Sequence, residues 1–313
     1  MTMPYQSDVN GPGERDCAAR WEMIRGELAP GAMLDIGSAE GWFGLRAARE
    51  LGMVVASVEA DAARAAAQCA ALRATEGAKD GGNSPEPPAG RLHVCRFGWS
   101  ADFGHRLAGT CEFFENALLL SVLHWLPEPE EVLAGVCAMA GRVFVELPEP
   151  DDATAGGSRV GPDLEEWLRL YSGRSVRLLG AVPAHTSATR RLWVLEGPME
   201  RRPRRAYLGA PVWRNRFLQR WDGSRLWFWK DGEKEAWTPG VNLWTLSKMR
   251  CAGADAIRAE TAAALGAWEA ANGPHEDKNL WNVLATAEGL KWFDGRCDGA
   301  PDGLAGQLEG FGK

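Results

Sequence analysis

The chain lacks any apolar run long enough to cross a membrane. No segment approaches the roughly 20 apolar residues that a transmembrane helix needs, and residues 1–8 contain no basic region followed by an apolar one. An excess of positive charge is also missing, because the 313 residues carry a net charge of -7, which lends no support to general nucleic-acid binding. These absences predict a cytoplasmic protein with no membrane span.

Paired cysteines are missing as well. The seven cysteines are odd in number and none is spaced as part of a pair: Cys17, Cys69, Cys95, Cys111, Cys137, Cys251 and Cys297. Their spacing suggests neither a disulfide framework nor a zinc site. We therefore expect most of them to be buried and reduced, and we expect no bound metal.

The most informative pattern lies between residues 33 and 59. Residues 33–36 are apolar except for Asp35, a pattern typical of a buried parallel strand, and the glycine-containing turn 37–41 then leads into a predicted helix over 43–51. A second apolar run over 53–58 ends at Glu59. Glycines let a backbone approach a ligand closely, and an acid at the end of the second strand lies where ribose hydroxyls would lie. The pattern predicts one βαβ unit that holds a nucleoside.

The type of nucleoside follows from two residues that a dinucleotide site would not have. Counting G-x-G-x-x-G from Gly37 places Ala39 second and Trp42 third, where a small residue is needed for close helix packing. Asp35 would repel a pyrophosphate, whereas it would attract a cationic nucleoside that carries an amino acid. Both observations argue against NAD and favour S-adenosylmethionine (SAM).

The pattern acid-x-Gly-x-x-x-Gly resembles motif I of the class I SAM-dependent methyltransferases. Asp35, Gly37 and Gly41 match it, while Ala39 stands where many members have a glycine. The resemblance implies that these residues contact the cofactor: Asp35, Gly37, Ser38, Ala39, Gly41 and Glu59, with Asp102 near the adenine. A βαβ unit that binds no nucleotide is the structural alternative.

The resemblance extends over about residues 30–197 and implies an α/β fold. Helices are predicted over 62–75 and 130–140, and further strands over 91–97, 117–123, 142–147, 176–180 and 192–196. In that family the strands form a doubly wound, Rossmann-like sheet of seven strands that ends in an antiparallel pair.

The same resemblance implies methyl transfer to an oxygen or nitrogen, or to a phosphate, on a small molecule or glycan. A hydroxyl or amine acceptor needs a base. His124 follows the fourth predicted strand, Glu146 ends the fifth, and His185 lies in the loop between the last two. Each residue also has a structural alternative. His124 would be a packed histidine, Glu146 would form an ion pair at the sheet edge, and His185 would be an exposed loop histidine.

The character of the chain changes near residue 199, so we predict one domain over 1–198 and a small α+β domain over 199–313. Nine of the fifteen tryptophans lie beyond residue 200, and residues 225–230 are typical of a β-hairpin arm. Seven arginines between residues 201 and 220 either contact phosphate or belong to a solvated linker. The phosphate alternative would suit an RNA methyltransferase.

Residues 275–295 resemble the catalytic loop of protein kinases and aminoglycoside phosphotransferases, His-x-Asp-x-x-x-x-Asn followed by strand, turn and strand. On that resemblance Asp277 is a base, and Asn282 and Asp294 hold magnesium. No glycine-rich phosphate loop precedes this segment. It is either a shortened kinase-like module or a coincidental strand–turn–strand. A methyltransferase-like domain followed by a kinase-like segment is similar to the methyltransferase–kinases that terminate bacterial O-antigen chains. A bifunctional enzyme or a phosphotransferase is therefore the alternative function.

Overall fold

The computed structural model describes residues 6, 16–76, 90–149, 160, 162–183, 189–202, 217–230, 233–274 and 278–292. Three predicted site residues, His185, Asp277 and Asp294, lie outside these ranges. The linker arginines at positions 204, 205, 214 and 216 also lie outside them.

A seven-stranded sheet forms the centre of the molecule, with strand order β3-β2-β1-β4-β5-β7-β6. β1 to β5 run parallel, and β7 runs antiparallel to both β5 and β6. The strands are Ala32–Ile36, Val54–Glu59, Arg91–Arg96, Phe114–Leu120, Ala140–Pro148, Ser175–Pro183 and Thr189–Glu196, numbered β1 to β7 in chain order. The predicted doubly wound α/β sheet with a final antiparallel pair is confirmed.

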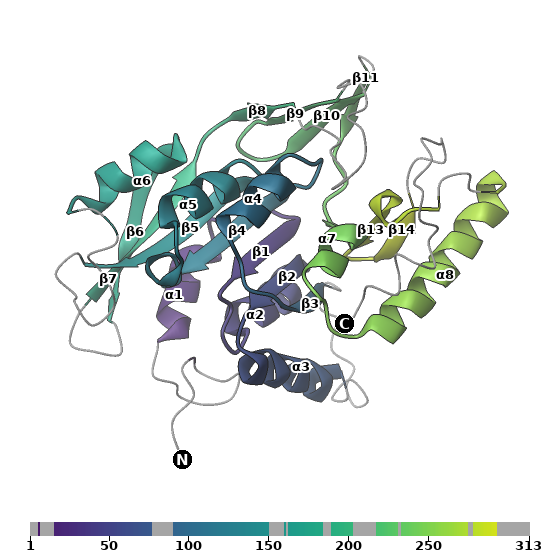
Figure 1. Cartoon of the computed structure of the whole chain (residues 1–313), viewed down its shortest axis with the longest axis horizontal. Helices are drawn as coiled ribbons and strands as arrows, with labels where there is room; N and C mark the ends of the chain where they lie inside the picture. Colours follow the sequence, from purple (N-terminus) through teal and green to yellow (C-terminus); the bar gives the residue numbers. More distant parts are fainter. Residues whose placement is uncertain are drawn as a thin grey trace.

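Helices cover both faces of this sheet (Figure 1). α1 (Cys17–Ile24), α2 (Trp42–Leu51) and α3 (Ala62–Glu76) share one buried apolar cluster with one face. α4 (Ala101–Ala108), α5 (Pro129–Cys137) and α6 (Leu164–Ser172) share another cluster with the opposite face. The strand order reverses between β1 and β4, and parallel sheets bind ligands at such switch points, beyond the carboxyl ends of the strands.

β4 differs in extent from the strand predicted over residues 117–123. It spans Phe114–Leu120, because Ser121 adopts a left-handed backbone conformation (φ 58°) that an extended strand cannot accommodate. The next residues form a short 3-10 helix, η2 (Leu123–Trp125). His124 therefore lies in the turn beyond the strand.

The carboxyl-terminal part is α+β, as predicted, and contains two small antiparallel sheets. The first has the order β11-β10-β9-β8, and its β9–β10 pair is the predicted hairpin arm. The second has the order β12-β13-β14. The elements are β8 (Met199–Arg201), β9 (Phe217–Trp221), β10 (Leu226–Lys230), β11 (Glu233–Ala236), β12 (Val241–Asn242), α7 (Leu243–Lys248), α8 (Ala254–Asn272), η5 (Leu280–Asn282), β13 (Val283–Thr286) and β14 (Gly289–Trp292).

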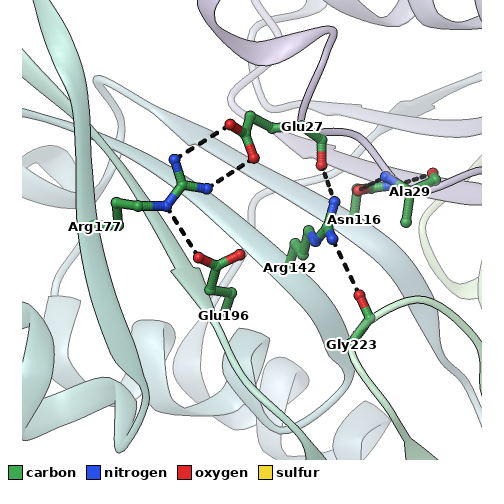
Figure 2. Close-up of polar contacts among 7 residues, drawn as sticks. All are labelled: Glu27, Ala29, Asn116, Arg142, Arg177, Glu196 and Gly223. Atoms are coloured by element: carbon green, nitrogen blue, oxygen red, sulfur yellow. Dashed lines mark hydrogen bonds and ion pairs between the residues drawn. The ribbon is translucent and has the colours of Figure 1, made fainter.

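Polar contacts hold the segment that enters β1 (Figure 2). Arg177 on β6 makes a two-pronged contact with the Glu27 carboxylate at 2.8 and 3.2 Å. Arg142 on β5 donates to the backbone carbonyl of Glu27 and, at 3.1 Å, to that of Gly223 in the β9–β10 turn. These contacts fix the start of β1 and tie the hairpin arm to the main sheet.

The carboxyl-terminal part also shares buried contacts with the sheet. Residues of β12, α7 and α8 belong to the same apolar cluster as β1, β2 and β4. Buried Glu112, just before β4, accepts hydrogen bonds from the Asn242 backbone N–H at 3.1 Å and from the Thr245 hydroxyl. Arg91 on β3 pairs with Glu260 on α8 at 2.7 Å. Within the described residues, none of the helices combines the length and apolar character needed to cross a bilayer.

Candidate functional site

The turn after β1 has a backbone conformation that residues with a side chain rarely adopt. Gly37, Ala39 and Gly41 all have positive φ, at 71°, 51° and 79°. A Cβ on Gly37 would lie 2.6 Å from the Val122 side chain, and one on Gly41 would lie 2.8 Å from that of Gln68. The two motif glycines are therefore required by conformation and by space. Ala39 holds a strained conformation, which is typical of ligand-binding turns.

The end of β2 anchors this turn through backbone and side chain. The N–H groups of Gly37 and Ser38 both donate to the Val58 carbonyl, at 2.9 and 3.2 Å. Glu59 is 7% exposed, and its Oε2 accepts from the Ala39 N–H at 2.8 Å while Oε1 accepts from Asp61 at the same distance. The structure thus brings the predicted loop and the predicted acid into direct contact.

Gln68 on α3 supports the turn from behind. Its amide nitrogen donates to the Ser38 hydroxyl at 2.8 Å and to the Ala39 carbonyl at 2.6 Å. Its amide oxygen accepts from the Ser57 hydroxyl at 2.7 Å. The Gln68 side chain is completely buried, so these bonds are made in a water-poor environment where an unpaired polar group would be costly.

Asp35 supplies a buried carboxylate at the carboxyl end of β1. It is 3% exposed, and its Oδ2 has no hydrogen-bond partner within the described structure. Burial, and then the nearby charge of Glu59, raise the pKa of Asp35 to about 7. A buried carboxylate without a full set of partners beside a second acid is an environment that a cationic ligand would stabilise.

A second group of polar side chains lies beyond β4 and β5. The hydroxyl of Ser121 donates to Glu146 Oε1 at 2.7 Å, and Arg20 Nε on α1 lies 2.8 Å from Glu146 Oε2. Arg20 and Glu146 are both buried, with side-chain exposures of 4% and 0%. Glu146 therefore links the left-handed residue after β4 to α1 through a buried ion pair.

His124 lies in η2, immediately beyond β4. Its ring is completely buried and packs at 5.0 Å, centre to centre, on the ring of Trp125, which is 60% exposed. Trp125 therefore exposes a large aromatic side chain beyond the carboxyl end of β4.

The remaining predicted residues belong to other elements than the turn 37–41. Asp102 is exposed on α4 and pairs with Arg106 at 2.9 Å. Asn282 is buried in η5, and the predicted strand–turn–strand after it is present as β13 and β14. Arg201 is half-buried, and its guanidinium donates to the backbone carbonyls of Ala108, Ala138 and Glu112. Among the described residues, no three His, Cys, Asp or Glu side chains form a metal-binding group.

Sequence reasoning missed Gln68, Arg20 and Ser121. Gln68 is a buried polar residue in an alanine-rich helix, and that contrast was the one available signal. Arg20 had no local signal, because its partner Glu146 is far along the chain. The positive φ of Ser121 has no sequence marker comparable to glycine.

The chain is similar to known methyltransferase structures. The bifunctional kinase-methyltransferase WbdD is 14% identical, with 93% of this chain and 79% of that chain covered and a TM-score of 0.48. The N-terminal domain of EvdMO1 with SAH bound is 14% identical over 57% of this chain and 78% of that chain, with a TM-score of 0.37. A methyltransferase from Pyrococcus furiosus is 16% identical over 57% of this chain and 81% of that chain, with a TM-score of 0.37.

No family model matches the chain, and no curated protein matches it.

Proposed function

We propose that this protein is a SAM-dependent methyltransferase whose cofactor site is the turn 37–41 with Asp35 and Glu59. The observation that carries the proposal is the buried Asp35 carboxylate, which lacks a partner for Oδ2 beside a turn with three positive φ angles. Two carboxylates at one glycine turn disfavour a pyrophosphate and favour a ligand with positive charge. SAM carries a sulfonium and an ammonium group on a nucleoside, so its chemistry fits these residues.

The individual roles follow from the positions of the residues. Asp35 would accept the positive charge of the methionine portion. Gly37, Ser38, Ala39 and Gly41 would line the nucleoside and methionine through backbone groups. Glu59, at the end of β2, would accept hydrogen bonds from ribose hydroxyls, which suits its place in the strand order. Asp102 remains a proposed adenine contact. When bound, SAM supplies an electrophilic methyl group.

The residues beyond β4 and β5 would handle the acceptor. Methyl transfer is an in-line displacement, so this side of the site must orient the nucleophile, exclude water and remove a proton from a hydroxyl or amine. We propose His124 as the first candidate for that base and exposed Trp125 as a surface for the acceptor. Glu146 is held by Arg20 and Ser121, which favours a role in positioning the turn over one in proton transfer. His185 remains a candidate from sequence alone.

Calorimetric titration with S-adenosylhomocysteine (SAH) tests the cofactor assignment. The wild-type chain should bind SAH. Glu59→Gln should weaken binding by about tenfold or more, since a charged hydrogen bond is worth about 1.5–3 kcal/mol. The amide still offers an oxygen to the Ala39 N–H, so the turn is preserved. Glu288→Gln, at an exposed carboxylate in the β13–β14 turn, is the matched control. Absence of SAH binding by the folded wild-type chain would refute the proposal.

A second candidate function, a kinase-like phosphotransferase activity in the carboxyl-terminal part, is favoured by one observation. Asn282 directly precedes the β13–β14 hairpin, in the order that the kinase resemblance implies. Titration with magnesium-ATP at saturating SAH would detect a separate nucleotide site. Binding that is lost in Asn282→Ala supports a bifunctional enzyme. Absence of binding leaves a methyltransferase with a substrate-handling domain.

A further inference from the structure

Two cysteines that are far apart in the sequence face each other across the junction of the sheet and the carboxyl-terminal part. Cys95 lies in β3, the edge strand of the sheet, and Cys251 lies between α7 and α8. The two residues form an isolated antiparallel bridge. Both are free thiols, with residue exposures of 0% and 1%.

The backbone around the bridge places the two side chains in a geometry that suits a disulfide. The N–H of Ala252 donates to the Val94 carbonyl at 2.7 Å, and the N–H of Arg96 donates to the Arg250 carbonyl at 3.4 Å. These bonds flank the cysteines, so Cys95 and Cys251 are a non-hydrogen-bonded antiparallel pair. Cα atoms of such pairs lie about 4.5 Å apart. Disulfides form over Cα separations of about 4.4–6.8 Å, so this pair can be joined without moving the backbone far.

The chemical environment of the pair favours oxidation. A hydrogen bond from Cys95, followed by hydrogen bonding with the His93 ring, lowers the pKa of the Cys251 thiol against the effect of burial. Burial and the neighbouring Cys251 raise the pKa of Cys95. Cys251 is therefore the cysteine of the pair that loses its proton more readily, and the thiolate is the reactive form of cysteine.

We propose that Cys95 and Cys251 are an oxidation site that forms an intramolecular disulfide when the protein meets a peroxide. The Cys251 thiolate attacks one peroxide oxygen, which breaks the O–O bond and, with one proton, yields a sulfenic acid and water. The Cys95 sulfur then attacks the Cys251 sulfur, its proton goes to the departing hydroxide, and a second water leaves. Two thiols are oxidised to one disulfide and one peroxide is reduced to two waters.

A peroxide can reach the buried Cys95–Cys251 pair through a local opening of the structure. The bridge is a single pair with two flanking backbone bonds, and it lies on the edge strand rather than in the sheet interior. Small openings of this kind cost less than global unfolding. A metal is the other common occupant of a cysteine cluster, but the described residues bring together no metal-binding group of three side chains.

The disulfide would join the edge of the cofactor-binding sheet to the carboxyl-terminal part. Phe97, two residues beyond Cys95, donates its N–H to the Glu59 carbonyl at 3.0 Å. The covalent link would therefore restrain the chain next to the proposed ribose-binding acid. It would also close a very long loop, which restricts the unfolded chain and raises thermal stability.

Peptide mapping of the intact wild-type protein tests the proposal without any variant. The protein is treated with hydrogen peroxide, denatured, alkylated with iodoacetamide and digested without reductant. We expect a linked peptide pair containing Cys95 and Cys251, two hydrogen atoms lighter than the reduced pair, and a melting temperature several degrees above that of the reduced protein. Recovery of both cysteines in alkylated form, a Cys69–Cys251 linkage, or stoichiometric zinc in the purified protein would overturn the proposal.

Cysteine-to-alanine variants then test whether the Cys95–Cys251 disulfide causes the rise in melting temperature. In Cys95→Ala and Cys251→Ala, peroxide should no longer raise the melting temperature, whereas Cys17→Ala, a buried cysteine in the other apolar cluster, should respond like the wild type. A peroxide-dependent rise that survives in Cys95→Ala would contradict the assignment.

Discussion

The backbone N–H of Ala39 donates to the Oε2 of Glu59 at 2.8 Å. This bond joins the middle of the turn after β1 to the acid that ends β2. The conformation of the turn and the position of the proposed ribose acceptor are consequently set together, and buried Gln68 holds the opposite side of the same turn.

Replacing Gln68 by alanine should weaken SAH binding by about tenfold or more and lower the stability of the protein. The change leaves the Ser38 hydroxyl, the Ala39 carbonyl and the Ser57 hydroxyl without a buried partner, at about 1–3 kcal/mol for each group that water cannot reach. Calorimetry and chemical denaturation measure the two effects. Arg64→Ala, exposed on the same helix, is the control, and equal SAH affinity in both variants would disprove the bracing role.

The stability of the ligand-free protein should fall as the pH rises from about 5 to about 7. Burial raises the pKa of Asp35 and Glu112 to about 7 and that of Glu115 to about 8. The folded state therefore holds protons that the unfolded state releases near pH 4, and each such group lowers the stability until the pH reaches its own pKa in the folded protein. Denaturant midpoints across the interval test this expectation. A midpoint that stays constant or increases would contradict it.

Replacing only one member of the buried Arg20–Glu146 ion pair should destabilise the protein. Arg20→Met leaves the Glu146 carboxylate buried beside Ser121 without its cation, and such losses amount to about 3–5 kcal/mol. The double variant Arg20→Met/Glu146→Leu should recover part of that loss, because neither side then buries a charge. Urea denaturation of the single and double variants completes the cycle. Strictly additive losses would show that the two side chains do not interact.

Arg201→Ala should destabilise the protein far more than Arg202→Ala. Arg201 is half-buried and donates to the carbonyls of Ala108, Ala138 and Glu112, whereas Arg202 is exposed. Thermal unfolding measures both effects. If single-stranded RNA binds the wild type with steep salt dependence and Arg201→Ala abolishes this binding without loss of stability, the RNA-binding alternative would be favoured instead.

The sequence was sufficient to predict the elements in which local pattern and burial agree. Residues 33–36 and 53–58 are mostly apolar and bounded by turn signals, and both belong to buried strands in the sheet. The glycines at positions 37 and 41 could be recognised as turn residues from the motif. The structure shows why glycine is needed there, because both positions have a positive φ and close neighbours. The order and direction of the seven strands followed from a family resemblance, since apolar runs alone do not specify which strands pair.

Contacts between distant residues were beyond sequence reasoning. Nothing near Cys95 indicates that Cys251 lies opposite, and nothing near Glu146 indicates Arg20 as its partner. The predicted strand over 117–123 included residues past Leu120, because Val122 and Leu123 are as apolar as the strand itself. The backbone of Ser121, which ends the strand, is set by tertiary contacts that include its bonds to Glu146.

The most direct test of the account is the affinity for SAM of the wild type and of Asp35→Asn, each measured at about pH 6 and about pH 8. If Asp35 holds the positive charge of the ligand, wild-type affinity rises by about tenfold as this carboxyl ionises near pH 7, and Asp35→Asn binds weakly with little dependence on pH. Equal or tighter binding by folded Asp35→Asn at both pH values would contradict the assignment of this turn as a site for a cationic nucleoside.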